Sequence, residues 1–448
     1  MKYIISLVFF VLSQLHYAGF AQKQLDKYIQ YGLVNNESIK QQQFILDKNL
    51  YALQEAKSLF LPTINFNTTY TLAGGGRTVD FPVGDLLNPV YKTLNQLTTS
   101  NNFPQVQNRS ILLNGNKFYD VKLHTTYPLI SAELAYNKKI KSQQFDLQKI
   151  EIDVYKRELA KEIKIAYYNY LQTSEAIKIY ENALLLVKEN ERINTALFNN
   201  QKVNRTAVVR SNNEVTKIYA QLNTGKQAQA NAKAYFNFLM NQPLTTEILT
   251  DSINSIPDAS IVNDTTVNKR EELLKLTIAK AINDNLIGFA NTYKRPRLNS
   301  FLDIGSQGFD FKVNDKSPYY FLGLSLEWTI FSGGKNKYRV KQAEADAKNI
   351  TSQNSYIEQQ LALQVKLAVN TFTAAVINYQ AAVSQVAASE KYYKDLLRLY
   401  KEGTALYIEL LDAQNQLVSA QFQANISLYA TWIKQAEIER ANAGLSIK

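Results

Sequence analysis

Four stretches of this sequence alternate between apolar and polar residues. The first is LPTINFNTTYTL at 61–72, in which every second residue is apolar apart from one threonine. FYDVKLHTTYPLI at 118–130 has the same pattern, and it returns after Pro296 and again at 319–331. A period of two over such lengths predicts β-strands with one apolar face. We therefore expect two strand pairs, over residues 62–130 and 297–331. The apolar positions that define the faces are Ile64, Phe66, Leu72, Val121, Leu123, Leu129, Leu298, Leu302, Ile304, Tyr320, Leu322, Leu324, Leu326 and Ile330.

Stretches with helical spacing separate the strand pairs. Residues 132–200 and 335–402 contain no proline or glycine. In the first of them, apolar residues recur every three or four positions along two neighbouring lines, which suits a helix packed between partners on both sides. At about 1.5 Å per residue, roughly 70 residues form a rod of about 100 Å. Shorter helices are predicted at about 25–59 and from 269 to Pro296.

Both long helical stretches are interrupted in the same way. LFNNQKVNRTAVV begins at Leu197 and LYKEGTALYIELL begins at Leu399, 202 residues further on. New helical stretches follow at 208–238 and 408–443, so each interruption predicts the bend of a helical hairpin. Gly403 is expected to end its helix. Thr206 and Thr404 are expected to cap the returning helices.

The order helix, strand pair and long helical hairpin occurs twice, which predicts an internal duplication. Between the first two strands, a segment with three glycines at 74–76 and several asparagines and prolines is expected to be a surface loop. The predicted organisation is a signal peptide at 1–21, a first repeat at 22–240, a linker at 241–268 and a second repeat at 269–448.

The N-terminus predicts export. Lys2 precedes an apolar run, and small residues around Ala18 and Ala21 follow it, as in a secretory signal peptide cleaved after Ala21. The chain has no cysteine, which excludes disulfides and a lipid attached to a cysteine at the cleavage site. Beyond the signal peptide the longest apolar run is Ala183 to Val187, so we expect any membrane crossing to be made by strands.

The predicted strands have the length of transmembrane β-strands, about ten residues each. Four strands cannot close a barrel, and lipid does not tolerate an open sheet edge, so several chains would have to share one barrel. Three chains would supply twelve strands. A soluble sheet packed on the helices is the alternative. Aromatic residues near the strand ends favour the membrane interface; they are Tyr70, Tyr119, Tyr127 and Trp328.

Composition argues against several other functions. The formal net charge of +11 would suit nucleic acid, but basic residues alternate with acidic and amide residues along the helices, and export makes nucleic acid an improbable partner. His124, the one histidine outside the predicted signal peptide, lies within a predicted strand. No phosphate-binding glycine loop and no metal-ligand spacing occurs. We therefore expect no enzyme activity and no catalytic, cofactor or metal site.

The bend at Tyr400-Lys-Glu-Gly403-Thr404, followed by Ile408-Glu409-Leu-Leu-Asp412-Ala413, resembles the signature of the TolC family of outer-membrane efflux channels. The likeness runs from GLVNNESI at 32–39 to the C-terminal helix. It implies an α+β membrane protein, a homotrimer whose twelve-stranded outer-membrane barrel continues into a periplasmic α-barrel of helical hairpins. It also implies an exit duct of a tripartite efflux or type I secretion system, fed by an inner-membrane pump through a periplasmic adaptor protein.

The resemblance implies that acidic residues ring the periplasmic entrance, at Glu409 and Asp412. Spaced three apart, they share one side of a helix, and three chains would gather six carboxylates. Ala405 stands where some members have the arginine that holds the entrance shut, so we expect Arg205 or Arg210 to pair with these acids instead. Adaptor docking is expected at the bend residues Gln201, Lys202, Val203, Asn204, Thr206, Gly403, Thr404, Ala405 and Leu406. The main alternative is a periplasmic adaptor or secreted coiled-coil scaffold without a barrel.

Overall fold

The computed structural model describes residues 23–260 and 270–444. The predicted signal peptide lies outside these residues, as does part of the predicted linker. The chain divides into two compact units. Among the described residues, the helical unit contains 23–51, 142–260, 270–284 and 345–444, and the sheet unit contains 52–141 and 285–344.

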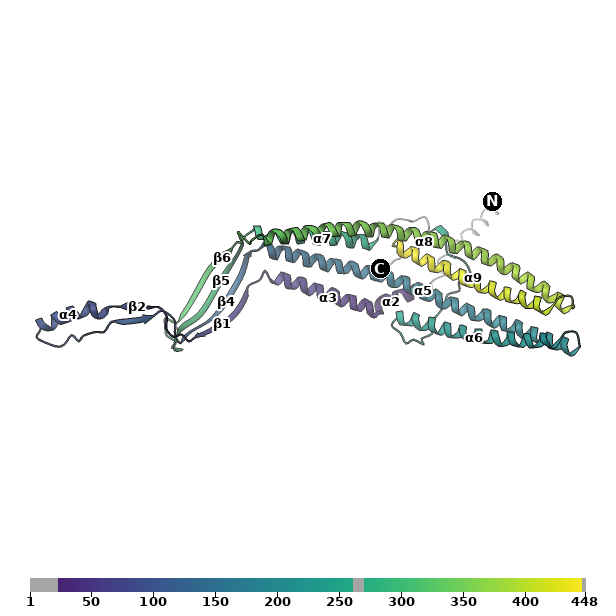
Figure 1. Ribbon diagram of the computed structural model, residues 1–448, viewed down its shortest axis with the longest axis horizontal. Helices are drawn as coiled ribbons and strands as arrows, with labels where there is room; N and C mark the ends of the chain where they lie inside the picture. The colour runs from purple at the N-terminus through teal and green to yellow at the C-terminus, as the bar shows by residue number, and fades with distance from the viewer. Residues whose placement is uncertain (1–22, 261–269, 445–448) are drawn as a thin grey trace, which may run out of the picture. The chain divides into compact units, whose positions relative to one another are not determined.

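The sheet unit is built on one antiparallel sheet in the order β1-β4-β5-β6 (Figure 1). Its strands are β1 Thr63–Thr71, β4 Phe118–Ile130, β5 Arg297–Phe309 and β6 Pro318–Glu327. The register aligns Phe66 with Leu123, Leu123 with Ile304, and Ile304 with Tyr320. The predicted apolar positions that fall within the four strands therefore lie on one face of the sheet, which confirms the strand prediction, whereas Leu72 and Ile330 lie beyond the strand ends.

Two details of this unit differ from the sequence prediction. The last strand ends at Glu327, so Trp328 lies just beyond it. The segment between β1 and β4 is not a structureless loop: it contains β2 Thr78–Phe81, α4 Val83–Leu97 and β3 Arg109–Leu112. Strands β2 and β3 pair antiparallel, with Val79 opposite Ile111. We refer to residues 72–117 as the insertion.

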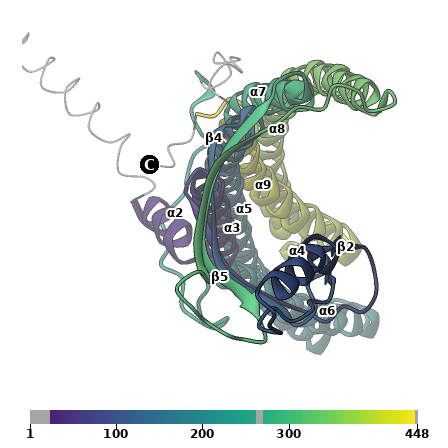
Figure 2. The same ribbon diagram turned by 90° about the vertical axis from the view of Figure 1, so that its left-hand side faces the viewer.

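In the helical unit, α5, α6, α8 and α9 lie side by side (Figures 1 and 2). α5 and α8 have 68 and 67 residues, which confirms the predicted long helices. The helix predicted at 25–59 is divided at Asn36, whose side chain accepts a hydrogen bond from the Ser38 backbone N–H at 2.9 Å and so caps α3. The helices are α2 Lys23–Asn35, α3 Glu37–Ser58, α5 Ala132–Asn199, α6 Arg205–Leu239, α7 Glu271–Ala290, η2 Asn291–Lys294, α8 Lys335–Lys401 and α9 Tyr407–Ala441.

The main core of the helical unit joins α2, α5, α6 and α9 around Tyr167 and Phe236. Tyr28 meets the Phe236 ring edge-on, with centroids 5.0 Å apart, and its hydroxyl accepts a hydrogen bond from the Leu249 backbone N–H at 2.8 Å. The Tyr167 hydroxyl accepts another from the Asp251 N–H, also at 2.8 Å. These two bonds fix the irregular segment after α6 to the core.

Within residues 23–260 and 270–444, α8 is the one helix long and apolar enough to cross a bilayer by length and composition. Some of its apolar side chains pack against a neighbouring helix. Val365, Ala368 and Phe372 are buried against Ile438 and Ala441 of α9. We therefore interpret α8 as a packing helix of the helical unit.

Candidate functional site

The two helix bends have the same backbone geometry. After α5, Gln201 adopts a positive φ of 61°, and the Lys202 N–H donates to the Leu197 carbonyl at 2.8 Å. After α8, Gly403 has a φ of 79°, and the Thr404 N–H donates to the Leu399 carbonyl at 3.0 Å. A left-handed residue followed by such a bond is the usual end of a helix. Gly403 therefore ends its helix as predicted.

The caps of the returning helices differ from the prediction. The N-cap of α6 is Asn204, whose side chain accepts a hydrogen bond from the Ala207 N–H at 3.2 Å, and not Thr206. The α9 helix begins after Leu406, and the Glu409 carboxylate accepts from the Leu406 N–H at 2.8 Å. The Thr404 hydroxyl instead donates to the Leu399 carbonyl at the end of α8. Glu409 thus helps to hold the start of α9 in position.

A shared core joins the two hairpins next to the bends. Three tyrosines of α8 and α9 dominate it, and Tyr400 lies 5.8 Å from Tyr407, centroid to centroid. Burial raises the pKa of Tyr393, of Tyr400 and of Tyr407, the last to about 12, and the nearby Glu214 carboxylate adds to the shift at Tyr407. At neutral pH these hydroxyls are therefore protonated and can donate hydrogen bonds.

Buried amides cross this core between the hairpins. The Tyr400 hydroxyl of α8 donates to the Asn194 side-chain oxygen of α5. The Asn190 amide of α5 donates to the Gln414 side-chain oxygen of α9 at 2.5 Å. One polar atom of each amide, Asn190 Oδ1, Asn194 Nδ2 and Gln414 Nε2, is buried without a hydrogen-bond partner among the described residues. Each of these amides therefore keeps one polar atom unpaired in the core, which lowers the stability of this layer.

The predicted entrance residues lie on the outside of the bends. Glu409 and Asp412 are exposed, while Leu410 and Ala413 between and beside them are buried. Asp412 accepts a hydrogen bond from the Gln416 amide at 2.7 Å. Arg205 and Arg210 are exposed on α6. Among the described residues of one chain, no ion pair joins either arginine to either carboxylate, so the predicted lock would have to form between chains.

Sequence reasoning did not identify the buried amides. Asn190 and Asn194 occupy the line of apolar residues that runs along α5 between Leu186 and Leu197. Polar residues within such a line were the available signal, because an amide in a packed seam must find a partner on a neighbouring helix. The partners, Tyr400 and Gln414, come from the other hairpin and are identifiable only in the fold.

The predicted interface aromatics lie at both ends of the apolar sheet face. Tyr70 and Tyr119 oppose each other at one end, and both stack on Phe311, at 4.8 and 5.5 Å between centroids. Tyr119 is consequently buried. Tyr127 and Trp328 lie near the other end and are exposed.

Part of the chain is similar to a known family. Residues 276–442 match the family model described as outer membrane efflux protein. A comparison of the sequence with curated proteins finds no match.

Solved structures show the same fold over nearly the whole chain. The outer-membrane channel OprN matches with a TM-score of 0.76 at 15% identity, covering 94% of this chain and 90% of that one. The Campylobacter jejuni outer membrane channel CmeC matches with a TM-score of 0.75 at 15% identity, covering 94% and 86%. The Vibrio cholerae outer membrane protein VceC matches with a TM-score of 0.75 at 13% identity, covering 94% and 98%. The chain therefore has the fold of the outer-membrane efflux channels.

Removing the Tyr400 hydroxyl tests how much the buried amide layer next to the helix bends contributes to stability. Tyr400→Phe leaves the Asn194 oxygen buried and unpaired, and we expect it to destabilise the bend region by about 1–2 kcal/mol. Amide hydrogen exchange near residues 190–200 and 400–410 should become about 5–30 times faster. The control is Tyr392→Phe on the exposed side of the same helix. Equal exchange in both variants would show that the Tyr400 bond contributes nothing.

Proposed function

We propose that three copies of this chain form the exit duct of a tripartite efflux or type I secretion system in the outer membrane. An inner-membrane pump delivers the substrate, and a periplasmic adaptor protein docks on the helix bends at 201–206 and 403–406. The three sheets close one twelve-stranded barrel in the outer-membrane lipid. The long helices continue the barrel as a periplasmic tunnel, and the two sequence repeats each supply two strands and one helical hairpin.

The observation that carries this proposal is the four-stranded sheet. One of its faces carries large apolar side chains that are mostly exposed to solvent; Ile64 is 68% exposed and Leu322 is 74% exposed. Among residues 23–260 and 270–444, both edge strands, β1 and β6, lack a second neighbouring strand. Exposed edges invite pairing with another chain, and an apolar face of this length suits lipid. Sharing one closed barrel satisfies both requirements.

The opposite face of the sheet carries a network of polar side chains and would line the barrel. Lys122 lies 3.4 Å from Asp303 and 3.7 Å from Asp120. His124 contacts the Asp303 carboxylate, and the Tyr319 hydroxyl donates to Asp120 at 2.5 Å. This network joins β4, β5 and β6 with charged and hydrogen-bonding groups, as expected for a water-filled interior.

Extraction distinguishes this proposal from the alternative of a periplasmic adaptor or scaffold. A peripheral protein leaves the membrane in high salt or carbonate, whereas a barrel requires detergent. We expect the protein to remain in the membrane pellet through both washes and to be released by detergent. Release by carbonate alone would mean that the sheet is not in lipid, and the proposed function would then be wrong.

Charge removal tests the proposed entrance. Glu409→Gln with Asp412→Asn keeps side-chain shape, and glutamine can still accept the Leu406 N–H. In planar bilayers we expect the cation preference of the trimer to fall severalfold, because six carboxylates would be lost from one opening. The matched control is Glu390→Gln, an exposed glutamate of α8 paired with Lys394. An unchanged ratio of cation to anion permeability would overturn the carboxylate ring.

A further inference from the structure

The insertion between β1 and β4 holds α4 by one face. Asn88 exchanges two hydrogen bonds with the Val106 backbone, at 2.8 and 3.0 Å. Asn95, two turns further along, exchanges two with the Phe103 backbone, at 2.8 and 3.1 Å. The segment that returns from α4 to β3 therefore covers this side of the helix.

The start of α4 is fixed by the same returning segment. The Asn108 side-chain oxygen accepts from the Gly84 and Asp85 N–H groups, at 2.9 and 3.1 Å. A Cβ at Gly84 would lie 2.4 Å from the Val106 carbonyl oxygen, so the close approach requires glycine. The inner face of α4 is thus bound to the returning segment of the insertion. These hydrogen bonds fix which face of α4 points towards that segment.

The opposite face of α4 is apolar and uncovered. Leu86, Val90, Thr93 and Leu97 follow each other at intervals of four, three and four residues. At about 100° per residue they fall within an arc of about 60°, and Asn88 and Asn95 point the other way. Leu86 is 69% exposed, Val90 52% and Leu97 76%. None of the four residues is charged.

The spacing of these four residues is compatible with a helical partner. Intervals of four, three and four are the heptad spacing by which helices pack against other helices in coiled coils. We propose that this face of α4 docks against the α4 helices of two further copies of the chain, forming a three-helix cluster. The proposal rests on the proposed trimer, because the trimer supplies three copies at one rim of the barrel.

The chain geometry allows the three helices to meet. Twelve strands about 4.8 Å apart, tilted by about 40°, close a barrel with a radius of roughly 12 Å. The linkers at 72–77 and 113–117 can extend to about 15–20 Å at about 3.3 Å per residue. The insertion can therefore reach the threefold axis from the strand ends.

Assembly of the trimer would also strengthen the association of the three α4 helices. A helix of 15 residues is too short to form a stable coiled coil in isolation. Three copies tethered to one barrel experience an effective concentration in the millimolar range, which makes weak packing sufficient. We therefore expect the cluster in the assembled channel and no association of the insertion by itself.

Single cysteines test this cluster, because the natural chain has none. In detergent-purified protein oxidised with copper phenanthroline, Val90→Cys should form chain-to-chain disulfides at least ten times faster than Lys92→Cys, which lies off the apolar face. Adding Leu86→Asp and Leu97→Asp to Val90→Cys should return the rate to that of Lys92→Cys. Light scattering on the same samples reports the number of chains independently.

Each outcome has a defined meaning. A trimer in which Val90→Cys reacts no faster than Lys92→Cys overturns the cluster and leaves the channel intact. In that case, quenching of a fluorophore at position 90 by spin-labelled lipid in reconstituted vesicles would assign the face to the membrane surface. A monomer by light scattering overturns the proposed trimer itself.

Discussion

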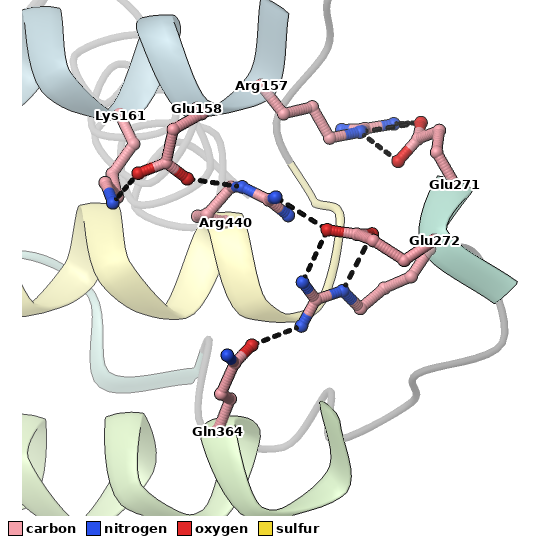
Figure 3. A network of polar contacts seen from close by, with 8 residues as sticks. Arg157, Glu158, Lys161, Glu271, Glu272, Gln364 and Arg440 are labelled. Carbon is pink, nitrogen blue, oxygen red and sulfur yellow. Dashed lines mark hydrogen bonds and ion pairs between the residues drawn. The ribbon is translucent and has the colours of Figure 1, made fainter. Parts of the chain in front are cut away.

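Replacing Arg440 by methionine should lower the free energy of unfolding by about 3–5 kcal/mol, because it breaks a buried ion-pair network at one member. Figure 3 shows the arrangement. The Arg440 guanidinium donates to Glu158 of α5 at 3.0 Å and to Glu272 of α7 at 2.6 Å. Glu272 also accepts two hydrogen bonds from Arg270, at 2.7 and 3.1 Å. Without Arg440, the largely buried Glu272 carboxylate and the partly exposed Glu158 carboxylate each lose a positive partner.

The network links helices that are distant in the sequence. Arg270 reaches Gln364 of α8 at 3.0 Å, and Arg157 of α5 holds the neighbouring Glu271 with hydrogen bonds of 2.6 and 2.7 Å (Figure 3). The Arg440 side chain is 12% exposed and that of Glu272 is 16% exposed. Because so little of these two side chains is exposed, water cannot replace the hydrogen bonds that Glu272 loses when Arg440 is removed. The expected destabilisation therefore exceeds that of a surface ion pair.

The same network predicts the response to acid. Burial by itself would raise the pKa of Glu272, but the hydrogen bonds from Arg270 and Arg440 outweigh it and lower the pKa to about 2. Because the folded-state pKa lies below the ordinary value of 4.5, this group stabilises the fold fully above pH 4.5. The contribution, about 3 kcal/mol, is lost as the pH falls from 4.5 towards 2.

The control for Arg440→Met is Lys434→Met on the same helix. Lys434 pairs with Glu437 at 2.8 Å, and both side chains are 33% exposed, so its loss should cost less than 1 kcal/mol. Unfolding would be followed by helix content at fixed protein and detergent concentrations. Equal stability losses in the two variants would contradict the buried network. Retention of the full acid sensitivity in Arg440→Met would also contradict it.

Placing a charge on the apolar sheet face should have the second large effect. Leu324 lies in the middle of β6 on that face, opposite Ser300 of β5. Arginine at a lipid-facing position near the bilayer centre costs about 2–4 kcal/mol in each chain. Three chains share one barrel in the proposed assembly, so Leu324→Arg should reduce the amount of detergent-extractable trimer by more than tenfold.

The neighbouring residue provides a matched control. Ser325 follows Leu324 on the same strand but faces the polar side of the sheet, opposite Asn299. Ser325→Arg should therefore assemble normally while altering conductance. If both variants assembled equally well, or equally badly, the two faces of the sheet would not differ in environment and the barrel would be contradicted.

The strands and long helices were predictable because single, strong periodicities encode them. Phe66, Leu123, Ile304 and Tyr320 belong to four different strands, yet the period of two placed each on the face where the register aligns them. Gly403 was predictable as a helix end because its positive φ favours glycine. These features depend on local sequence alone.

The insertion was mispredicted because its signals conflict. Glycines at 74–76 and Pro89 argue for a loop, and a proline inside a helix removes one backbone hydrogen bond. The helical spacing of Leu86, Val90 and Leu97 was the opposing signal. Contacts distant in the sequence favour the helix over a loop, because the Asn88 and Asn95 side chains of α4 bind the backbone of the returning segment.

The candidate site was predictable in position and not in its interactions. The bends at 201 and 403 follow from sequence, but the caps depend on which of several polar residues reaches the free N–H groups. Asn204 and Glu409 do so, whereas Thr404 bonds to the preceding helix. The pairs Asn194–Tyr400 and Asn190–Gln414 join residues more than 200 positions apart, and only the packed hairpins bring them together.

The most direct test of the central claim is single-particle imaging of the detergent-extracted protein. The proposal that three chains share one outer-membrane barrel predicts class averages with threefold symmetry and twelve strands around one lumen. The edge strand β1 of each chain should then pair with β6 of its neighbour. A single-chain particle, or a protein recovered intact without detergent, would contradict the shared barrel and with it the proposed exit duct.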